Sequence, residues 1–301
     1  VELAHNGVGV QNMFTRLKPL APSPQAGVIG VPTQSRGMDK ADIKEFRRWH
    51  RNAALRAKEA EADLVYVYAG HDSTLLMHFL QKRRNHRTDE YGGSLENRMR
   101  FVIEVCHRIR KMAGGDFIVG MTVSGAEPYP GGLTIADKQE IAAYLDARGL
   151  VDYFSVGTGS YLNQHTKIVP SFQYDMMLGP PDARKFKEAV SHAVVTAEAR
   201  IKTPANAEQV IAGGMADLVS IVRGQIADPH LANKARDGRA DDVRPCINCN
   251  QLCIGRRMRD YWISCLVNPS VGREFEWDGD RLPPVETPRK ILVVGGGPAG
   301  L

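Results

Sequence analysis

The sequence predicts an α/β protein built on a parallel β-sheet, and three observations lead to this fold class. Short runs of β-branched and aromatic residues alternate with longer segments whose apolar residues recur at helical spacing. Such alternation places parallel strands side by side with the helices outside them. Finally, 43% of the 301 residues are apolar and 24% are charged, which is ordinary for a globular chain and excludes a disordered or fibrous one.

Six strand–helix units can be followed in order along the chain. Three of the helices begin with residues that favour helix starts, namely Asp39, Ser94 and the pair Thr134 and Asp137, which has capping-box spacing. The predicted strands are 1–4, 64–68, 117–123, 151–156, 193–197 and 218–222. The predicted helices are 39–62, 94–113, 134–148, 181–192, 204–213 and 230–237.

Two architectures fit these units: a doubly wound open sheet, and an eightfold barrel that lacks its first two units. In a barrel, the chemistry lies at the C-terminal ends of the strands. The polar residues expected at those ends are Glu2, His5, Tyr68, His71, Thr122, Thr158, Arg200 and Arg223. Their clustering predicts a site there, but periodicity alone does not decide whether the sheet closes.

The charge balance points to no macromolecular partner of strong charge. The formal net charge is only +5, and no apolar run approaches the 18 residues of a membrane span. We therefore expect neither a membrane nor a nucleic-acid partner. Two arginine clusters have few aromatic neighbours and are expected in solvated loops: Arg83, Arg84 and Arg87, and Arg256, Arg257 and Arg259.

Four of the five cysteines lie close together, in the pattern Cys246-x2-Cys249-x3-Cys253-x11-Cys265. Clustered thiols predict a metal centre in a reducing compartment rather than a disulfide framework. The spacing favours an iron–sulfur cluster, with three close ligands and one remote ligand, over zinc, which usually takes two separated pairs. A non-catalytic, zinc-stapled binding module is the alternative. Cys106 is expected to be a core residue.

The end of the chain carries the start of a dinucleotide-binding motif. An apolar run at 291–294 leads directly into Gly295, Gly297 and Gly300, which is the context that a G-x-G-x-x-G turn requires. The helix that would hold the pyrophosphate is missing, and Val1 already begins a strand. We therefore expect the chain to be an internal fragment of a longer protein, with a linker at 273–288.

The sequence Tyr68-Ala69-Gly70-His71 follows a predicted strand. The glycine lets the chain turn, so that the tyrosine and the histidine can converge over a ligand. Residue types alone leave a structural and a catalytic role open.

Two segments resemble a known family. Residues 85–98 (NHRTDEYGGSLENR) closely resemble a signature of the old yellow enzyme family of FMN-dependent barrels. The cysteine run, with 264–269 (SCLVNP), resembles its larger members, the 2,4-dienoyl-CoA reductases and the trimethylamine dehydrogenase and N-methyl amine demethylase types. The resemblance implies a (β/α)8 TIM barrel lacking its first two strands (1–238), a 4Fe–4S segment with a linker (239–288), and the start of a Rossmann-type FAD/NAD(P) domain (289–301).

The resemblance also implies roles for single residues. Glu2 matches a contact to the FMN ring, and Arg200 and Arg223 match residues near the FMN phosphate and ring. Tyr68 and His71 match a catalytic pair on the substrate side in the amine dehydrogenases. Two positions depart from the family: Thr122 stands where a basic residue is usual, and Ser160 stands where some amine dehydrogenases carry an acid.

The implied activity is that of a cytoplasmic flavoprotein oxidoreductase acting on a small molecule. A hydride would pass between a substrate carbon and FMN N5, either in NAD(P)H-driven reduction of an activated C=C bond or in oxidative demethylation of an N-methylated amine. The Tyr-x-x-His pair favours the amine and the cysteine spacing favours the C=C bond. A pyridine nucleotide or an electron-transfer flavoprotein would be the electron partner, and a homo-oligomer is compatible with this role.

Overall fold

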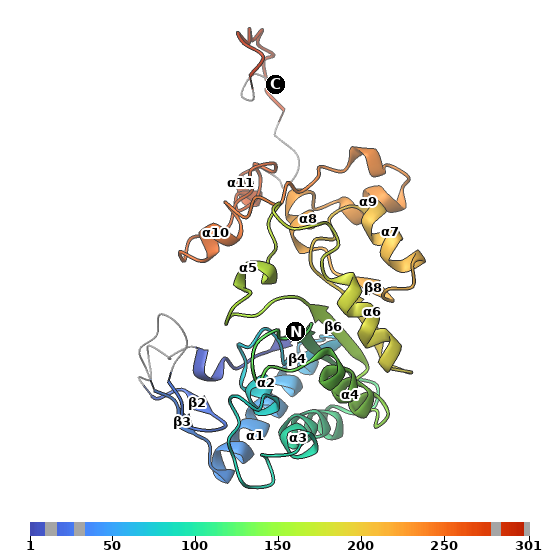
Figure 1. Cartoon of the computed structure of the whole chain (residues 1–301). Coiled ribbons are helices and arrows are strands. Elements are labelled where there is room, and N and C mark those ends of the chain that lie inside the picture. The colour runs from blue at the N-terminus through green and yellow to red at the C-terminus, as the bar shows by residue number, and fades with distance from the viewer. Residues whose placement is uncertain (10–16, 27–33, 278–283, 298–301) are drawn as a thin grey trace. The chain divides into compact units, whose positions relative to one another are not determined.

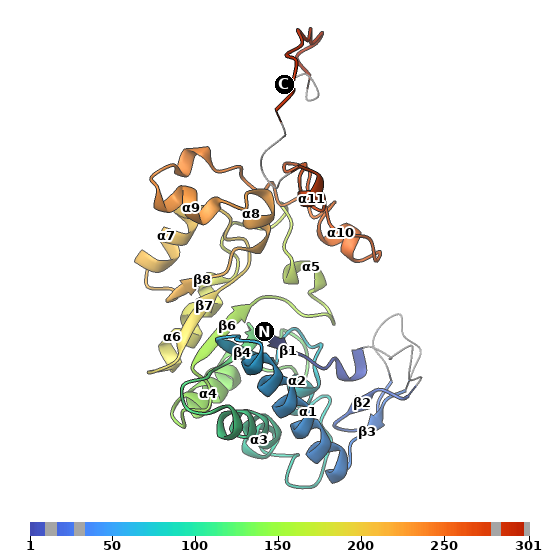
Figure 2. The same ribbon diagram turned by 180° about the vertical axis from the view of Figure 1, so that it is seen from behind.

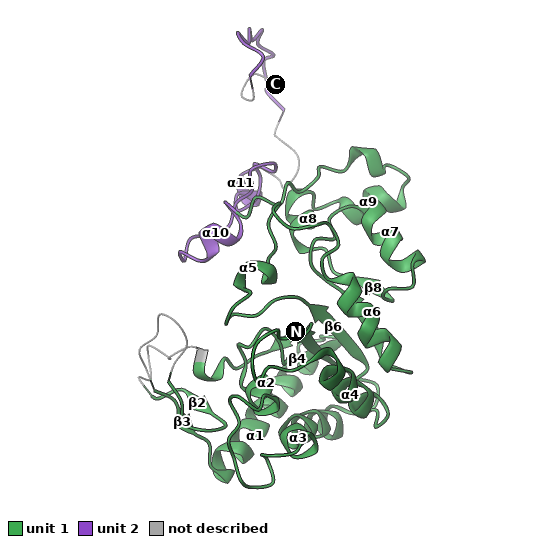
Figure 3. Ribbon diagram, viewed as in Figure 1, with its two compact units in different colours: residues 1–250 green, residues 251–301 purple. Residues whose placement is uncertain are grey.

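The computed structural model describes residues 1–9, 17–26, 34–277 and 284–297 (Figure 1). Two compact units make up the chain, residues 1–250 and residues 251–301 (Figure 3). The family-based domain limits at 238 and 288 stay predictions. No helix within the described ranges combines the length and the apolar character that crossing a membrane needs.

A parallel sheet of six strands forms the centre of the first unit, in the order β1-β4-β5-β6-β7-β8. The strands are β1 (Glu2–Leu3), β4 (Leu64–Tyr68), β5 (Ile118–Ser124), β6 (Tyr153–Gly157), β7 (Val194–Ala197) and β8 (Leu218–Val219). The strand order follows the chain order without the reversal that defines a doubly wound sheet. The fold is therefore of the TIM-barrel class, although β1 and β8 do not pair to close the sheet. A separate pair, β2 (Leu20–Ala21) and β3 (Arg36–Gly37), was not predicted.

Helices follow the strands and pack on them. The helices of the first unit are α1 (Lys40–Glu59), α2 (Leu75–Leu80), α3 (Leu95–Ala113), α4 (Ile135–Asp146), α5 (His165–Ile168), α6 (Pro180–Ala189), α7 (Pro204–Ala212), α8 (Val222–Ala227) and α9 (Leu231–Arg236). Helices α1 and α3 lie side by side (Figures 1 and 2), and α4 packs against α6. The second unit contains the short helices α10 (Ile254–Arg257) and α11 (Glu274–Trp277).

The predicted helix starts are confirmed. The Ser94 hydroxyl accepts a hydrogen bond from the Asn97 amide, and capping boxes begin α1 and α4. Between α1, α2 and α3 the rings of Phe46, Phe79 and Phe101 pack together, with the ring centroid of Phe101 4.9 Å from that of Phe46 and 4.2 Å from that of Phe79. This aromatic cluster packs α1, α2 and α3 against one another.

Two predicted strands differ in the structure. The segment 218–222, apolar except for Ser220, was predicted as one strand, but the strand ends at Val219 and Val222 already begins α8. A short apolar segment can form part of a strand or of a buried helix, and its pattern does not distinguish the two. Arg223 therefore lies in a helix and not at a strand end. Residues 291–294 form no strand and are exposed, with Leu292 87% accessible. A strand needs a neighbour for its backbone hydrogen bonds, and this segment has none among the described residues.

Candidate active site

One row of side chains crosses the inner face of the sheet near the C-terminal ends of its strands. Tyr68, Thr122, Ser155 and Thr196 are register partners on four adjacent strands. Register partners point to the same face, so these polar groups line one floor. The hydroxyls of Thr122 and Thr196 are buried; that of Thr122 faces the carboxylate of Glu2, and that of Thr196 has no hydrogen-bond partner among the described residues. A buried hydroxyl without a partner is available to a polar ligand.

Tyr68 and His71 come together, as predicted. The phenol oxygen of Tyr68 lies 2.5 Å from Nδ1 of His71. Burial lowers the pKa of His71 to about 4, and the positive charge of Lys138 adds to this effect, so the imidazole is neutral at physiological pH. Burial also raises the pKa of Tyr68, which keeps its proton. The simplest assignment is that the phenol donates to Nδ1, which leaves the imidazole proton on Nε2.

A carboxylate stands opposite this pair. A Cβ placed on Gly157 would lie 2.9 Å from His71 Nε2 and 3.3 Å from Glu198 Oε2, so both atoms face the same point above the end of β6. The Ser155 hydroxyl donates to Oε1 of Glu198. Burial raises the pKa of Glu198; burial also raises that of Glu2, and the charge of Glu198 adds to the shift at Glu2. The acid near His71 thus comes from the end of β7, which sequence reasoning missed.

The position where the family places an acid has a structural role here. Ser160 is buried, and its hydroxyl accepts a hydrogen bond from the Leu162 amide at 3.1 Å. It therefore shapes the turn that follows β6.

A buried ion pair lies beneath the loop that carries His71. The carboxylate of Asp72 accepts two hydrogen bonds from Arg84, each of 2.8 Å, and Arg84 also donates to Gln25 Oε1. Burial opposes ionisation of Asp72, but Arg84 outweighs it and lowers the pKa of Asp72. The expectation that Arg84 lies in a solvated loop was wrong, because its side chain is only 5% exposed. Spacing along the chain could not reveal a partner that is brought close by folding.

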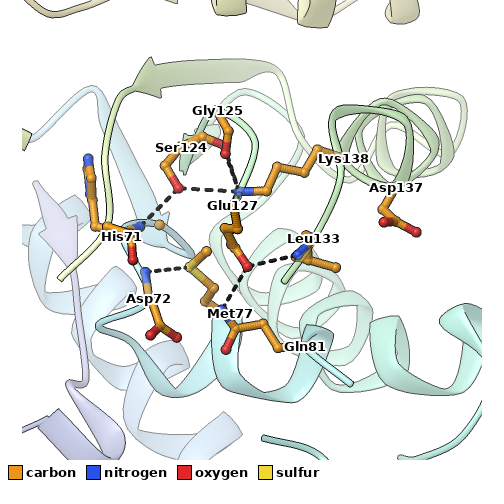
Figure 4. A network of polar contacts seen from close by, with 12 residues as sticks. His71, Asp72, Met77, Gln81, Ser124, Gly125, Glu127, Leu133, Asp137 and Lys138 are labelled. Atoms are coloured by element: carbon orange, nitrogen blue, oxygen red, sulfur yellow. Dashed lines mark hydrogen bonds and ion pairs between the residues drawn. The ribbon is translucent and has the colours of Figure 1, made fainter. Parts of the chain in front are cut away.

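A second buried network joins α4 to the same loop (Figure 4). The ammonium of Lys138 contacts the carbonyl oxygens of Ser124 and Gly125 and the carboxylate of Glu127. Sequence analysis missed this lysine. Its position would have been a signal, because Lys138 interrupts the apolar stripe formed by Ile135, Ile141 and Leu145 on α4.

The two arginines predicted to bind FMN hold a neighbouring segment. Arg200 donates to the carbonyl oxygens of Ser171 and Tyr174, and Arg223 donates to the Pro170 carbonyl at 2.8 Å. Both guanidinium groups are thus near one another on the segment after α5. Their roles toward a cofactor stay predictions.

The residues present fit a flavin mononucleotide. The hydroxyls of Thr122 and Thr196 suit the polar edge of an isoalloxazine ring, and two arginines stand beyond β7 and β8 for a phosphate. Thr122 itself carries no charge, so the positive charges near this part of the sheet are those of Lys138, Arg200 and Arg223.

The cysteines divide between the two units: Cys246 and Cys249 belong to the first, and Cys253 and Cys265 to the second. The Asn248 amide donates to the sulfur of Cys246 at 3.4 Å, an interaction common around iron–sulfur clusters. No group of three metal-ligating side chains comes together among the residues described. The ligand set therefore stays a prediction. Cys106 is buried in the core, as expected.

The glycine motif is only partly described. Gly295 and Gly297 lie in the exposed segment after 284, and Gly300 falls outside the described residues. The dinucleotide role of the three glycines stays a prediction.

A sequential parallel sheet with polar groups at its C-terminal edge is the arrangement of a barrel-type enzyme. Residues 1–242 match the NADH:flavin oxidoreductase / NADH oxidase family, and the chain belongs to this family of flavin-dependent oxidoreductases.

The relatives include an NADH oxidase as well as enzymes whose names describe amine oxidation. The chain is 38% identical to an NADH oxidase of Thermoanaerobacter brockii, over 95% of this chain and 43% of the relative. It is 39% identical to an N,N-dimethylglycine/sarcosine dehydrogenase of Chromohalobacter salexigens, over 82% and 36%. The solved 6-hydroxypseudooxynicotine amine oxidase of Pseudomonas geniculata is 34% identical, with a TM-score of 0.91, over 99% and 44%. The chain thus spans less than half the length of these relatives.

Proposed function

We propose that the protein oxidises an N-methylated amine at an FMN held over the inner face of the sheet. The observation that carries the proposal is the Tyr68–His71 contact, with a neutral imidazole that faces the carboxylate of Glu198. The two acids Glu2 and Glu198 near the Tyr68–His71 pair suit a substrate that arrives as an ammonium ion. Two of the relatives named above carry amine-oxidising names.

The chain's own residues would prepare the amine. An ammonium ion has no lone pair, so it must lose a proton before a neighbouring C–H bond can be broken. Burial raises the pKa of Glu198 and lowers that of His71, so Glu198 is a stronger base than the imidazole it faces and would take that proton at Oε2. Tyr68 and His71 would hold the nitrogen and the carboxylate in position. When bound, FMN supplies the hydride acceptor.

The products follow from atom balance. The methyl carbon gives up a hydride, the nitrogen lone pair forms a C=N bond, and water adds to that carbon. Formaldehyde and the demethylated amine then leave. Glu2, Thr122, Thr196, Arg200 and Arg223 would hold the FMN.

Further modules would remove the electrons. We infer that the thiolates of Cys246, Cys249, Cys253 and Cys265 hold a 4Fe–4S cluster and that the glycine motif belongs to an FAD/NAD(P) domain. A pyridine nucleotide or an electron-transfer flavoprotein would accept the electrons from these modules. The enzyme would work in the cytoplasm, and a homo-oligomer is compatible with this role.

Reduction of an activated C=C bond by NAD(P)H is the second candidate. The NADH oxidase relative supports this direction, and the protonated Tyr68 could supply the proton that the second carbon needs.

Anaerobic mixing of the full-length flavoprotein with each reductant separates the candidates. We expect sarcosine-type N-methyl amines to bleach the flavin absorbance and to release formaldehyde stoichiometrically. Bleaching by NADPH alone, with reoxidation by an activated alkene, supports the second candidate. A flavin that neither reductant bleaches contradicts both.

A further inference from the structure

The loop after β4 holds two consecutive residues in the left-handed backbone region. His71 has a φ of 59° and Asp72 a φ of 54°. The left-handed region disfavours any residue with a Cβ, so the surroundings must hold the loop in place. The amide of His71 donates to the Ser124 hydroxyl at 3.1 Å, and the amide of Asp72 donates to the sulfur of Met77 at 3.0 Å. Ser124 is therefore the direct support of the histidine backbone.

Ser124 is in turn held by a buried cation (Figure 4). The ammonium of Lys138 lies 2.8 Å from the Ser124 carbonyl oxygen, 3.3 Å from its hydroxyl oxygen and 2.7 Å from the Gly125 carbonyl oxygen. Its fourth partner is Oε1 of Glu127, at 3.0 Å. The lysine side chain is 5% exposed and that of Glu127 is 1% exposed. One hydroxyl group thus links the cation to the backbone of His71.

Glu127 is itself fixed on every side. Its Oε2 accepts hydrogen bonds from the Gln81 side chain at 2.9 Å, the Tyr129 hydroxyl at 3.0 Å and the Leu133 amide at 2.9 Å. A buried carboxylate held by three hydrogen bonds at one oxygen and an ion pair at the other has little freedom to move. A shift of the ammonium would move Ser124.

We propose that Lys138 is a positioning residue, which fixes His71 against Tyr68 through the Ser124 hydroxyl. The inference deepens the proposed function, on which it depends only for the part that His71 plays in the reaction. A purely structural ion pair would stabilise the fold without controlling where the imidazole lies, so loss of the Ser124 hydroxyl would leave kcat unchanged.

The charges around Lys138 and His71 provide a second measurement, the pKa of His71. Lys138 faces Glu127, Asp182 on α6 and Asp72. His71 faces Tyr68, the Thr158 carbonyl group, Lys138 and, across Gly157, Glu198. Burial lowers the pKa of His71 most, and the lysine charge contributes next. Removing the charge should raise the pKa of His71 part of the way from about 4 toward 6.5.

The first variant tests the link alone. Ser124→Ala removes the shared hydroxyl and leaves the buried ion pair intact. We expect kcat for the amine to fall about tenfold, with KM nearly unchanged, because the imidazole is less well placed. Ser94→Ala is the matched control, since that hydroxyl also accepts a hydrogen bond from a backbone amide, that of Asn97, but caps α3 and does not hold the His71 loop. Equal kcat values for Ser124→Ala and the control would overturn the proposal.

The second set tests the charge. Lys138→Met with Glu127→Gln removes both charges, so that no unpaired ion stays buried. NMR of ¹³C-labelled histidine in the full-length flavoprotein, with His71→Gln to assign the signal, should show an upward pKa shift. Lys138→Arg should keep the low pKa, and Lys234→Met, which breaks another ion pair, should leave it unchanged. An unshifted His71 in the double variant would overturn the proposal.

These measurements separate the two proposals. The histidine titration needs no substrate, so it stands even if N-methyl amines fail to bleach the flavin. In that case the proposed function fails and the positioning role survives. Bleaching by amines with an unshifted His71 supports the proposed function and overturns the positioning role. Should the double variant not fold, Ser124→Ala and Lys138→Arg still decide.

Discussion

Arg84→Met should destabilise the barrel unit strongly, because it removes the main partner of a buried carboxylate and leaves it only a 3.9 Å contact with Arg83. Asp72 is 1% exposed and loses two hydrogen bonds of 2.8 Å. Removing one member of a buried ion pair costs about 3–5 kcal/mol, and the orphaned Gln25 oxygen adds about 1 kcal/mol. For a unit of this size the thermal midpoint should fall by at least about 6 °C.

A surface pair provides the control. Arg36 makes the same two-pronged contact with Asp42, at 2.6 and 2.8 Å, but its side chain is 48% exposed. Arg36→Met should cost no more than about 1 kcal/mol. Thermal unfolding of the full-length flavoprotein, followed by circular dichroism, compares the variants, and adding Asp72→Asn to Arg84→Met should recover part of the loss. Equal midpoints for Arg84→Met and Arg36→Met would refute the reasoning.

The remaining predictions concern the site, the cluster and acid stability. Tyr68→Phe should lower the rate of flavin bleaching by amine about 10²-fold at unchanged flavin content, and Glu198→Gln should raise KM for an ammonium substrate. Cys265→Ser should lose iron and acid-labile sulfide, measured by colorimetric analysis. Burial lowers the pKa of His50 to about 4, so stability present above pH 6.5 is lost as pH falls toward 4; His50→Gln should flatten that fall in thermal midpoint.

Elements fixed by neighbours in the sequence could be predicted. Ser94 caps α3 by bonding an amide three residues away, and the order of alternating elements led to the parallel sheet. Apolar periodicity left the architecture open, and it was the strand order that favoured the barrel class. The end of β8 was misplaced because the segment 218–222, apolar except for Ser220, has no local marker where sheet gives way to helix.

The site was only half predictable. Tyr68 and His71 are three residues apart, so a single turn brings them together. Lys138 and Glu198 reach the same place from other elements, and only the fold reveals that they face the histidine. Arg84 shows the same limit, because a charged residue in a polar stretch is buried only when a distant acid receives it.

Gly157 is a position at which a substitution would disturb the site without changing its charge. The imidazole of His71 occupies the space that any side chain at 157 would need, since a Cβ there would lie 2.9 Å from its Nε2. A single methyl group at 157 would have to push the ring away from Tyr68, although the charges of the site stay the same. We expect Gly157→Ala to lose activity and to keep its flavin, which would make the variant suitable for trapping a bound substrate.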